Sequence, residues 1–243
     1  MARVAAIGAA VFALSAMLPA EPPREAGVLH YSAEWRLMNA GVARLNLQPQ
    51  PGQTDLHLET VGFVARLYKV NDDYSTLFND SFCASSTMLT VNESKRRRVT
   101  RVTFNRPPGK ASYEERDLER DAVVSTREID VPPCVHDVLS GLARLRTMTL
   151  EPGQSIEMPL SDGKKSVSGR ITALGRETLK TRAGEERTIR YEAILFNDVL
   201  YRRKGRLLLW LTDDARRLPV QIRIQLPFYL GTITLRLEKE EKS

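Results

Sequence analysis

His136, Asp137 and Ser140 are the residues whose types and spacing come nearest to a catalytic set. On one helix, His136 and Ser140 are four residues apart and share a face, so the imidazole could activate the hydroxyl. Asp137 would point about 100° away around that helix, and the chain contains no Gly-x-Ser-x-Gly nucleophile motif. The alternative interpretation is that these residues cap an amphipathic helix. We therefore predict no catalytic residues.

Residue types that bind metals are present but scattered. Asp213 and Asp214 lie between two expected strands, where aspartates commonly accept hydrogen bonds from turn amides, and two arginines follow closely. His30 and His57 lie in separate strands and could become neighbours only through strand pairing. We predict no metal site and no cofactor.

Basic residues are concentrated in the segment 95–101, where five of seven residues are Lys or Arg, and the segment 201–206 adds four more. Arginine matches phosphate and carboxylate groups through its planar guanidinium, so Arg96, Arg98 and Arg101 are candidate ligand-binding residues. The alternative is that they form cross-strand ion pairs with the acids of the segment 113–121. A net charge of +6 is modest for 243 residues, and no aromatic residues alternate with the basic ones, so we expect no nucleic acid partner.

Aromatic residues form a second candidate group for ligand binding. Trp35, Trp210, Phe228 and Tyr229 could line a pocket for an apolar chain, because ligand cavities are mostly apolar. They could equally be ordinary core residues.

The elements that must position these residues are mainly strands. Apolar and polar residues alternate in segments such as 28–37, 42–47 and 56–61, and Gly, Pro and Asn residues separate them, with a turn expected at 39–41. This pattern is typical of antiparallel strands with one buried face. Further strands are expected at 111–119, 122–129, 155–159, 165–174, 177–180, 187–196, 207–211, 219–225 and 231–237.

Two helices are expected between these strands. Val138, Leu139, Leu142 and Leu145 have helical spacing, and they predict one central helix at about 135–146, directly after Pro132 and Pro133. A short helix is expected at 63–69, where the spacing of apolar residues changes.

The first twenty residues have the pattern of a secretory signal peptide. A basic start is followed by an apolar run of about 15 residues, which is short for a membrane-spanning helix, and then by Pro19 and Ala20. A retained anchor is the alternative. We expect a signal peptide at 1–20, a single β-rich domain at 21–243, and a periplasmic or secreted protein that is not integral to the membrane after cleavage.

Export bears on the two cysteines, Cys83 and Cys134. In an oxidising compartment a pair of cysteines is more often bridged than free, so we predict a disulfide that closes a loop of about 50 residues. Two unpaired buried thiols are the alternative.

Four segments resemble a bacterial family of domains of unknown function, DUF family 3108. The segment 134–146 is similar to the central helix of the family, 209–220 to its second recurring block, 231–235 to its closing strand, and 31–43 to its opening hairpin. Members are exported envelope proteins without an established activity. The resemblance therefore implies a periplasmic location and a mainly β fold, an antiparallel sheet curled into an open barrel or clam-like half-barrel, and it provides no catalytic residues.

Together these observations predict a non-enzymatic envelope protein that binds an amphipathic ligand such as a lipid or glycolipid. Apolar side chains would hold the ligand inside a curved sheet, and arginines would lie at its edge. Two alternatives remain open: a hydrolase of envelope glycans or lipids with His136 or a carboxylate as base, and a structural module whose basic face binds an envelope protein partner.

Overall fold

The computed structural model describes residues 27–47, 52–182, 184–196, 198–200, 202, 204–227 and 231–241, and the segment expected to be a signal peptide lies outside them. Antiparallel strands dominate the described residues, as the alternating pattern predicts. The strands are β1 (Val28–Trp35), β2 (Met38–Leu47), β3 (Gln53–Thr60), β4 (Asn71–Phe78), β5 (Ala84–Glu93), β6 (Arg96–Asn105), β7 (Lys110–Asp117), β8 (Ala122–Asp130), β9 (Ser155–Ser161), β10 (Ser166–Thr181), β11 (Gly184–Ile194), β12 (Arg206–Thr212), β13 (Pro219–Gln225) and β14 (Thr232–Glu241). The helices are α1 (Gly62–Leu67) and α2 (Val138–Arg146).

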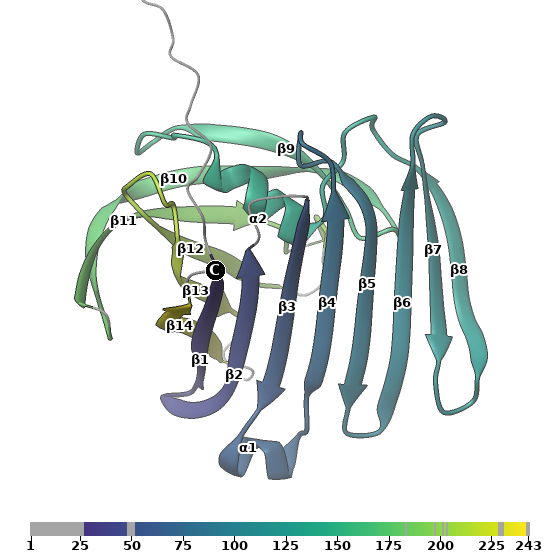
Figure 1. Ribbon diagram of the computed structural model, residues 1–243, viewed down its shortest axis with the longest axis horizontal. Coiled ribbons are helices and arrows are strands. Elements are labelled where there is room, and N and C mark those ends of the chain that lie inside the picture. Colours follow the sequence, from purple (N-terminus) through teal and green to yellow (C-terminus); the bar gives the residue numbers. More distant parts are fainter. Residues whose placement is uncertain are drawn as a thin grey trace, which may run out of the picture.

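Within the described residues, the fourteen strands form one antiparallel sheet in the order β8-β7-β6-β5-β4-β3-β2-β1-β14-β13-β12-β11-β10-β9. The sheet consists of two meanders, one of strands β1–β8 and one of strands β9–β14. They are joined near the middle of the sheet, where the first strand, β1, pairs with the last, β14. The edge strands β8 and β9 are consecutive in the chain but do not pair with each other. The sheet curls around α2 without closing (Figure 1), which confirms the predicted open barrel with a central helix.

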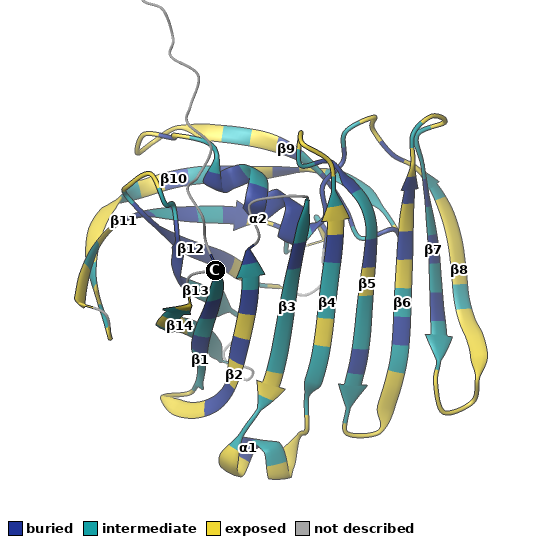
Figure 2. Cartoon of the chain, in the orientation of Figure 1, coloured by how far each residue is buried: buried dark blue, intermediate teal, exposed yellow. Residues whose placement is uncertain are grey.

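Burial follows the alternation of side chains along the strands. Leu207, Leu209 and Leu211 of β12 point to the same face, and Leu29 and Tyr31 of β1 are also buried. Helix α2 contacts β3, β4 and β9, and its dark colour in Figure 2 marks it as buried between the two meanders. The main hydrophobic core therefore lies where α2 meets the sheet.

The first hairpin turns earlier than the sequence predicts. The turn is at Arg36 and Leu37, which have φ angles of 50° and 66°, and Trp35 pairs with Met38. The segment 39–41 lies within β2 instead. Gly41 is needed there because a Cβ would collide with the backbone carbonyl oxygen of Glu59.

Other differences concern element boundaries. Helix α2 begins at Val138, because residues 131–137 form an extended connection before it. Helix α1 ends at Leu67 and not at 69. Strand β4 was not expected, since it opens with the polar residues Asn71, Asp72 and Asp73. The two strands expected at 165–174 and 177–180 are one strand, β10, in which the register shifts next to Gly175.

Candidate functional site: an apolar cavity between helix α2 and the sheet

The connection 131–137, which we call the strap, holds α2 against both meanders. A disulfide joins Cys134 of the strap to Cys83 next to β5. The carbonyl oxygen of Val135 accepts a hydrogen bond from the amide of Ala84, and His136 forms a parallel bridge with Leu160 of β9. The strap therefore links β5 to β9 across the open side of the sheet.

Asp137 fixes the beginning of α2. Its carboxylate accepts hydrogen bonds from the backbone amides of Leu139 and Ser140, and the Ser140 hydroxyl accepts one from the Asp137 amide. This reciprocal arrangement is a capping box. Tyr74 and Thr76 of β4 also donate their hydroxyls to the Asp137 carboxylate, each at 2.7 Å. One buried side chain thus caps the helix and attaches it to the sheet.

Arg146 fixes the other end of α2. Its Nε donates to the carbonyl oxygen of Arg217 and its guanidinium NH₂ donates to that of Arg216, both at 3.0 Å. Burial lowers the pKa of Arg146 to about 10, so the side chain stays charged near neutral pH. The charge is matched by carbonyl dipoles of the turn between β12 and β13, and the helix is thereby held at both ends.

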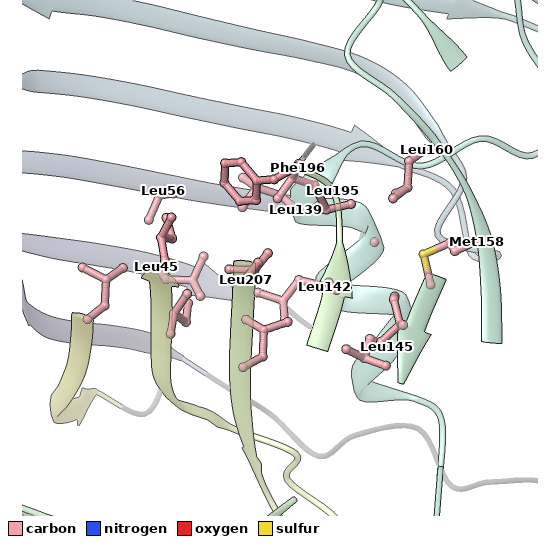
Figure 3. A pocket seen from close by; sticks show the side chains of 18 of the residues that line it. Leu45, Leu56, Leu139, Leu142, Leu145, Met158, Leu160, Leu195, Phe196 and Leu207 are labelled. Carbon is pink, nitrogen blue, oxygen red and sulfur yellow. The ribbon is translucent and has the colours of Figure 1, made fainter. Parts of the chain in front are cut away.

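Between α2 and the sheet lies a cavity of about 380 Å³. Ligand pockets in proteins commonly span roughly 300–1,000 Å³. Figure 3 shows Leu139, Leu142 and Leu145 of α2 in this cavity together with side chains from several strands. The lining residues are Tyr31, Leu45, Leu56, Leu58, Val138, Leu139, Gly141, Leu142, Leu145, Met158, Leu160, Ile171, Ala193, Leu195, Phe196, Leu207, Leu209, Ile222, Ile224 and Leu235.

The cavity has a deep part and a mouth. Most lining residues are buried, but seven are only partly buried: Leu56, Leu58, Val138, Phe196, Ile222, Ile224 and Leu235. Leu58, Ile224 and Leu235 lie within three residues of Thr60, Gln225 and Thr232, the strand ends nearest the turn between β1 and β2. The mouth therefore lies toward that end of the sheet.

The polar atom of the lining is already engaged. The hydroxyl of Tyr31 donates to the carbonyl oxygen of Pro219 at 2.6 Å, and burial raises the pKa of this tyrosine. The remaining lining side chains are hydrocarbon apart from the Met158 thioether. Such a surface can hold an apolar chain but offers it neither a charge nor a free hydrogen bond.

A cavity of this size is costly if nothing fills it. Protein interiors are close-packed, so apolar side chains around such a volume lack packing partners on one side. An apolar ligand would recover these lost contacts.

The structure places Arg96 and Arg98 beside a buried carboxylate. Glu115 of β7 is 5% exposed, and its carboxylate accepts hydrogen bonds from Arg96 at 3.0 Å, Arg98 at 2.7 Å and Tyr113 at 2.9 Å. This is the cross-strand pairing that the sequence left as an alternative. Arg101 lies on the other face of β6, where it pairs with Glu114 of β7 in the strand register, and it is exposed. These three arginines are not part of the cavity lining.

Glu115 is strongly held in its charged form. Burial alone would raise the pKa of the carboxyl, but the hydrogen bonds from Arg98, Tyr113 and Arg96 outweigh burial and lower the pKa to about 2. Lys164, in the turn after β9, approaches the same carboxylate at 3.7 Å. The cluster therefore ties the turn between β9 and β10 to β7.

The two predicted tryptophans, Trp35 and Trp210, do not line the cavity. Trp210 is buried on the other face of β12 and donates its indole N–H to Glu177 at 2.8 Å. Trp35 ends β1, where the Arg36 guanidinium lies 5.1 Å from its ring centre. Phe228 and Tyr229 lie outside the described residues.

The residues first considered for catalysis have other partners. His136 Nδ1 lies 2.7 Å from the carbonyl oxygen of Phe82, and burial lowers the pKa of this histidine. Asp137 and Ser140 form the capping box. His30 and His57 lie on either side of Arg44 in the strand register. Among the described residues, no group of three or more His, Cys, Asp or Glu side chains is placed to hold a metal ion.

Sequence reasoning missed most of the lining, although part of its signal was visible. Val138, Leu139, Leu142 and Leu145, the four residues that predicted the helix, all line the cavity. The strand residues opposite them were recognised only as members of a buried face. Their convergence around one empty volume depends on how the sheet curls, which the alternation does not specify.

Comparisons with known proteins identify a family and one solved structure with a similar fold. A family model described as "Protein of unknown function (DUF3108)" matches residues 30–238. The crystal structure of a β-barrel-like protein of domain of unknown function DUF1849 from Brucella abortus is similar, with a TM-score of 0.59 and 8% identity over 91% of this chain and 99% of that one. A DUF1089 family protein from Pseudomonas aeruginosa matches with a TM-score of 0.40 and 14% identity over 80% and 92% of the two chains. No curated protein matches the sequence.

No helix within the described ranges combines the length and the apolar character needed to cross a bilayer.

Proposed function

Because the chain belongs to the DUF3108 family of proteins of unknown function, we propose its role from the site itself: it binds the hydrocarbon part of an amphipathic ligand in the cavity between α2 and the sheet. A lipid or glycolipid has the required chemistry. The observation that carries the proposal is the cavity of about 380 Å³, whose lining is apolar apart from one engaged hydroxyl.

The polar part of such a ligand would remain outside the deep part of the cavity. The lining offers no charged group, so burying a headgroup there would leave it without partners, which is costly. The partly buried residues Leu58, Phe196 and Ile224 mark where the chain would leave the protein. We therefore place the headgroup at the mouth.

The proposed site of action is the bacterial envelope, after export. Two observations support export: the basic, apolar and small-residue order of the first twenty residues, and the disulfide between Cys83 and Cys134. Fractionation of the native bacterium followed by N-terminal sequencing tests this part. An intact residue 1 in the cytoplasmic fraction would contradict it.

Ligand binding is tested on protein purified without detergent. Organic extraction and mass spectrometry should release a hydrocarbon-chain amphiphile at up to one molecule per protein. After extraction, a fluorescent fatty acid should bind and be displaced by the released compound. Protein that carries no extractable compound and does not bind the probe contradicts the proposal.

A substitution inside the cavity provides the matched test. Ala193 is a small, buried lining residue on β11, and Ala193→Phe places a ring in the space that the ligand would use. The variant should fold and should lose probe binding at least about tenfold, the effect of losing the burial of one or two methylene groups. Ala122→Phe, at an exposed position of the edge strand β8, adds the same ring elsewhere and should leave probe binding unchanged.

A further inference from the structure

One end of the sheet carries an exposed apolar surface surrounded by basic residues. We call it the rim and define it as residues 36–38 of the turn between β1 and β2, residues 62–69 with α1, and residues 94–97 of the turn between β5 and β6. The Val61 amide donates to the Ala40 carbonyl oxygen, and the Ser94 amide donates to that of Lys69. The three segments are therefore neighbours, and Figure 2 shows α1 and the first turn largely in the exposed colour.

Large apolar side chains of the rim point into solvent. Leu37 is 91% exposed, Leu67 is 64% exposed and Phe63 is 63% exposed, and Met38 and Tyr68 lie beside them. Exposed apolar residues are ordinary when they are single, whereas a contiguous group marks an interaction surface.

Leu37 is the most informative of these residues because folding does not favour it. Its φ of 66° lies in the left-handed region, where a two-residue hairpin turn prefers Asn or Gly. At 91% exposure the side chain also contributes little to packing. Neither the backbone nor the core requires a leucine here, so its side chain is available for a contact outside the molecule.

The charge of the rim selects the kind of partner. The three segments contain the basic residues Arg36, Arg66, Lys69, Lys95, Arg96 and Arg97, and the acid beside them, Glu93, accepts a hydrogen bond from the Tyr68 hydroxyl at 2.9 Å. Arg96 is partly engaged by Glu115, while Lys69 and Lys95 are exposed. Apolar side chains that project from a basic surface suit a bilayer interface, where lipid phosphates lie just outside the acyl chains.

The position of the rim connects it to the cavity. Leu58 lies at the mouth, and Thr60 is the last residue of β3 before the connection to α1. This separation of two residues corresponds to about 7 Å along a strand. Residue 27 and Glu241 lie at the other end of β1, away from the rim. A bilayer at the rim would face the mouth of the cavity.

We propose that the rim docks on an anionic lipid bilayer, with Leu37, Phe63 and Leu67 inserted at the interface and the basic residues on lipid phosphates. Passage of an acyl chain between bilayer and cavity rests on the proposed function. The docking itself is measured separately from cavity binding.

The test is flotation of the purified protein with vesicles, using its natural N-terminus in every variant so that differences report the rim alone. Wild-type protein should float with vesicles of phosphatidylcholine and phosphatidylglycerol and much less with phosphatidylcholine alone. Leu37→Asn, and Phe63→Ser with Leu67→Ser, should each weaken binding at least about tenfold, because each variant loses at least one apolar side chain that the bilayer would bury. Lys69→Gln with Lys95→Gln should weaken it about fivefold per charge.

Leu77→Ser is the matched control, because Leu77 is 46% exposed at the far end of β4. It should float as wild type does. The docking proposal is overturned if Leu37→Asn, Phe63→Ser with Leu67→Ser and wild type all float equally. It is also overturned if wild-type protein binds neither kind of vesicle, and a protein partner would then be the remaining explanation of the rim. Fatty-acid binding is measured in parallel: if it persists while flotation fails, docking is wrong and the cavity proposal stands.

Discussion

Asp137 concentrates four hydrogen bonds at the junction of α2 and the sheet. Asp137→Ala should remove the helix cap and the carboxylate to which the Tyr74 and Thr76 hydroxyls donate. We expect a loss of about 2–4 kcal/mol in the free energy of unfolding, measured by urea denaturation. Asp80→Ala, at an exposed turn, is the control and should have a much smaller effect. Equal effects of the two substitutions would contradict the role given to Asp137.

Glu115 makes stability depend on pH. Its folded-state pKa of about 2 lies below the ordinary value of 4.5, so its stabilisation is complete above pH 5 and is lost as the pH falls toward 2. Glu115→Gln should cost up to about 3 kcal/mol near neutral pH, and this difference from wild type should shrink between pH 5 and pH 2. Unfolding curves across that range measure it, and Glu114→Gln, on the other face of β7, controls for the lost charge. A difference that does not change with pH would contradict the assignment.

At the scale of elements, the strap connects the two meanders, whereas the disulfide alone attaches the strap only to Cys83 beside β5. Cys134 and His136 attach it to opposite sides of the open sheet, and α2 follows directly. Cys83→Ser with Cys134→Ser should lower stability by about 4 kcal/mol, the chain-entropy value for a loop of this length. Because the strap positions α2, fatty-acid binding should also weaken. Calorimetry and probe titration measure the two effects, and intact-mass analysis without reductant should find the wild type two hydrogens lighter than the reduced chain.

The sequence indicated the elements better than it indicated the site. Alternation predicted most strands and helical spacing predicted α2, because both reflect burial on one face. The turn at Arg36 and Leu37 was missed because its residues are not those that left-handed backbone prefers. The ion pairs of Arg96 and Arg98 with Glu115 depend on register, which alternation leaves undetermined.

At the scale of the molecule, the cavity exists because the sheet curls around α2 without closing and the two meanders meet the helix from different sides (Figure 1). A filled interior and a ligand cavity differ in how they respond to an added ring. In a molecule whose interior is already full, Ala193→Phe is overpacking and should cost roughly 1–3 kcal/mol. In a molecule with a ligand cavity, the same ring recovers contacts and should raise the melting temperature of the ligand-free protein.

A bound amphiphile stabilises the folded state, more strongly the tighter it binds, so fatty acid should raise the melting temperature of wild type and have little effect on the variant. The proposal therefore requires two results. Without ligand, the variant should have a higher melting temperature than wild type, and fatty acid should raise its melting temperature less. A variant that melts below ligand-free wild type while still responding to fatty acid would place the binding elsewhere.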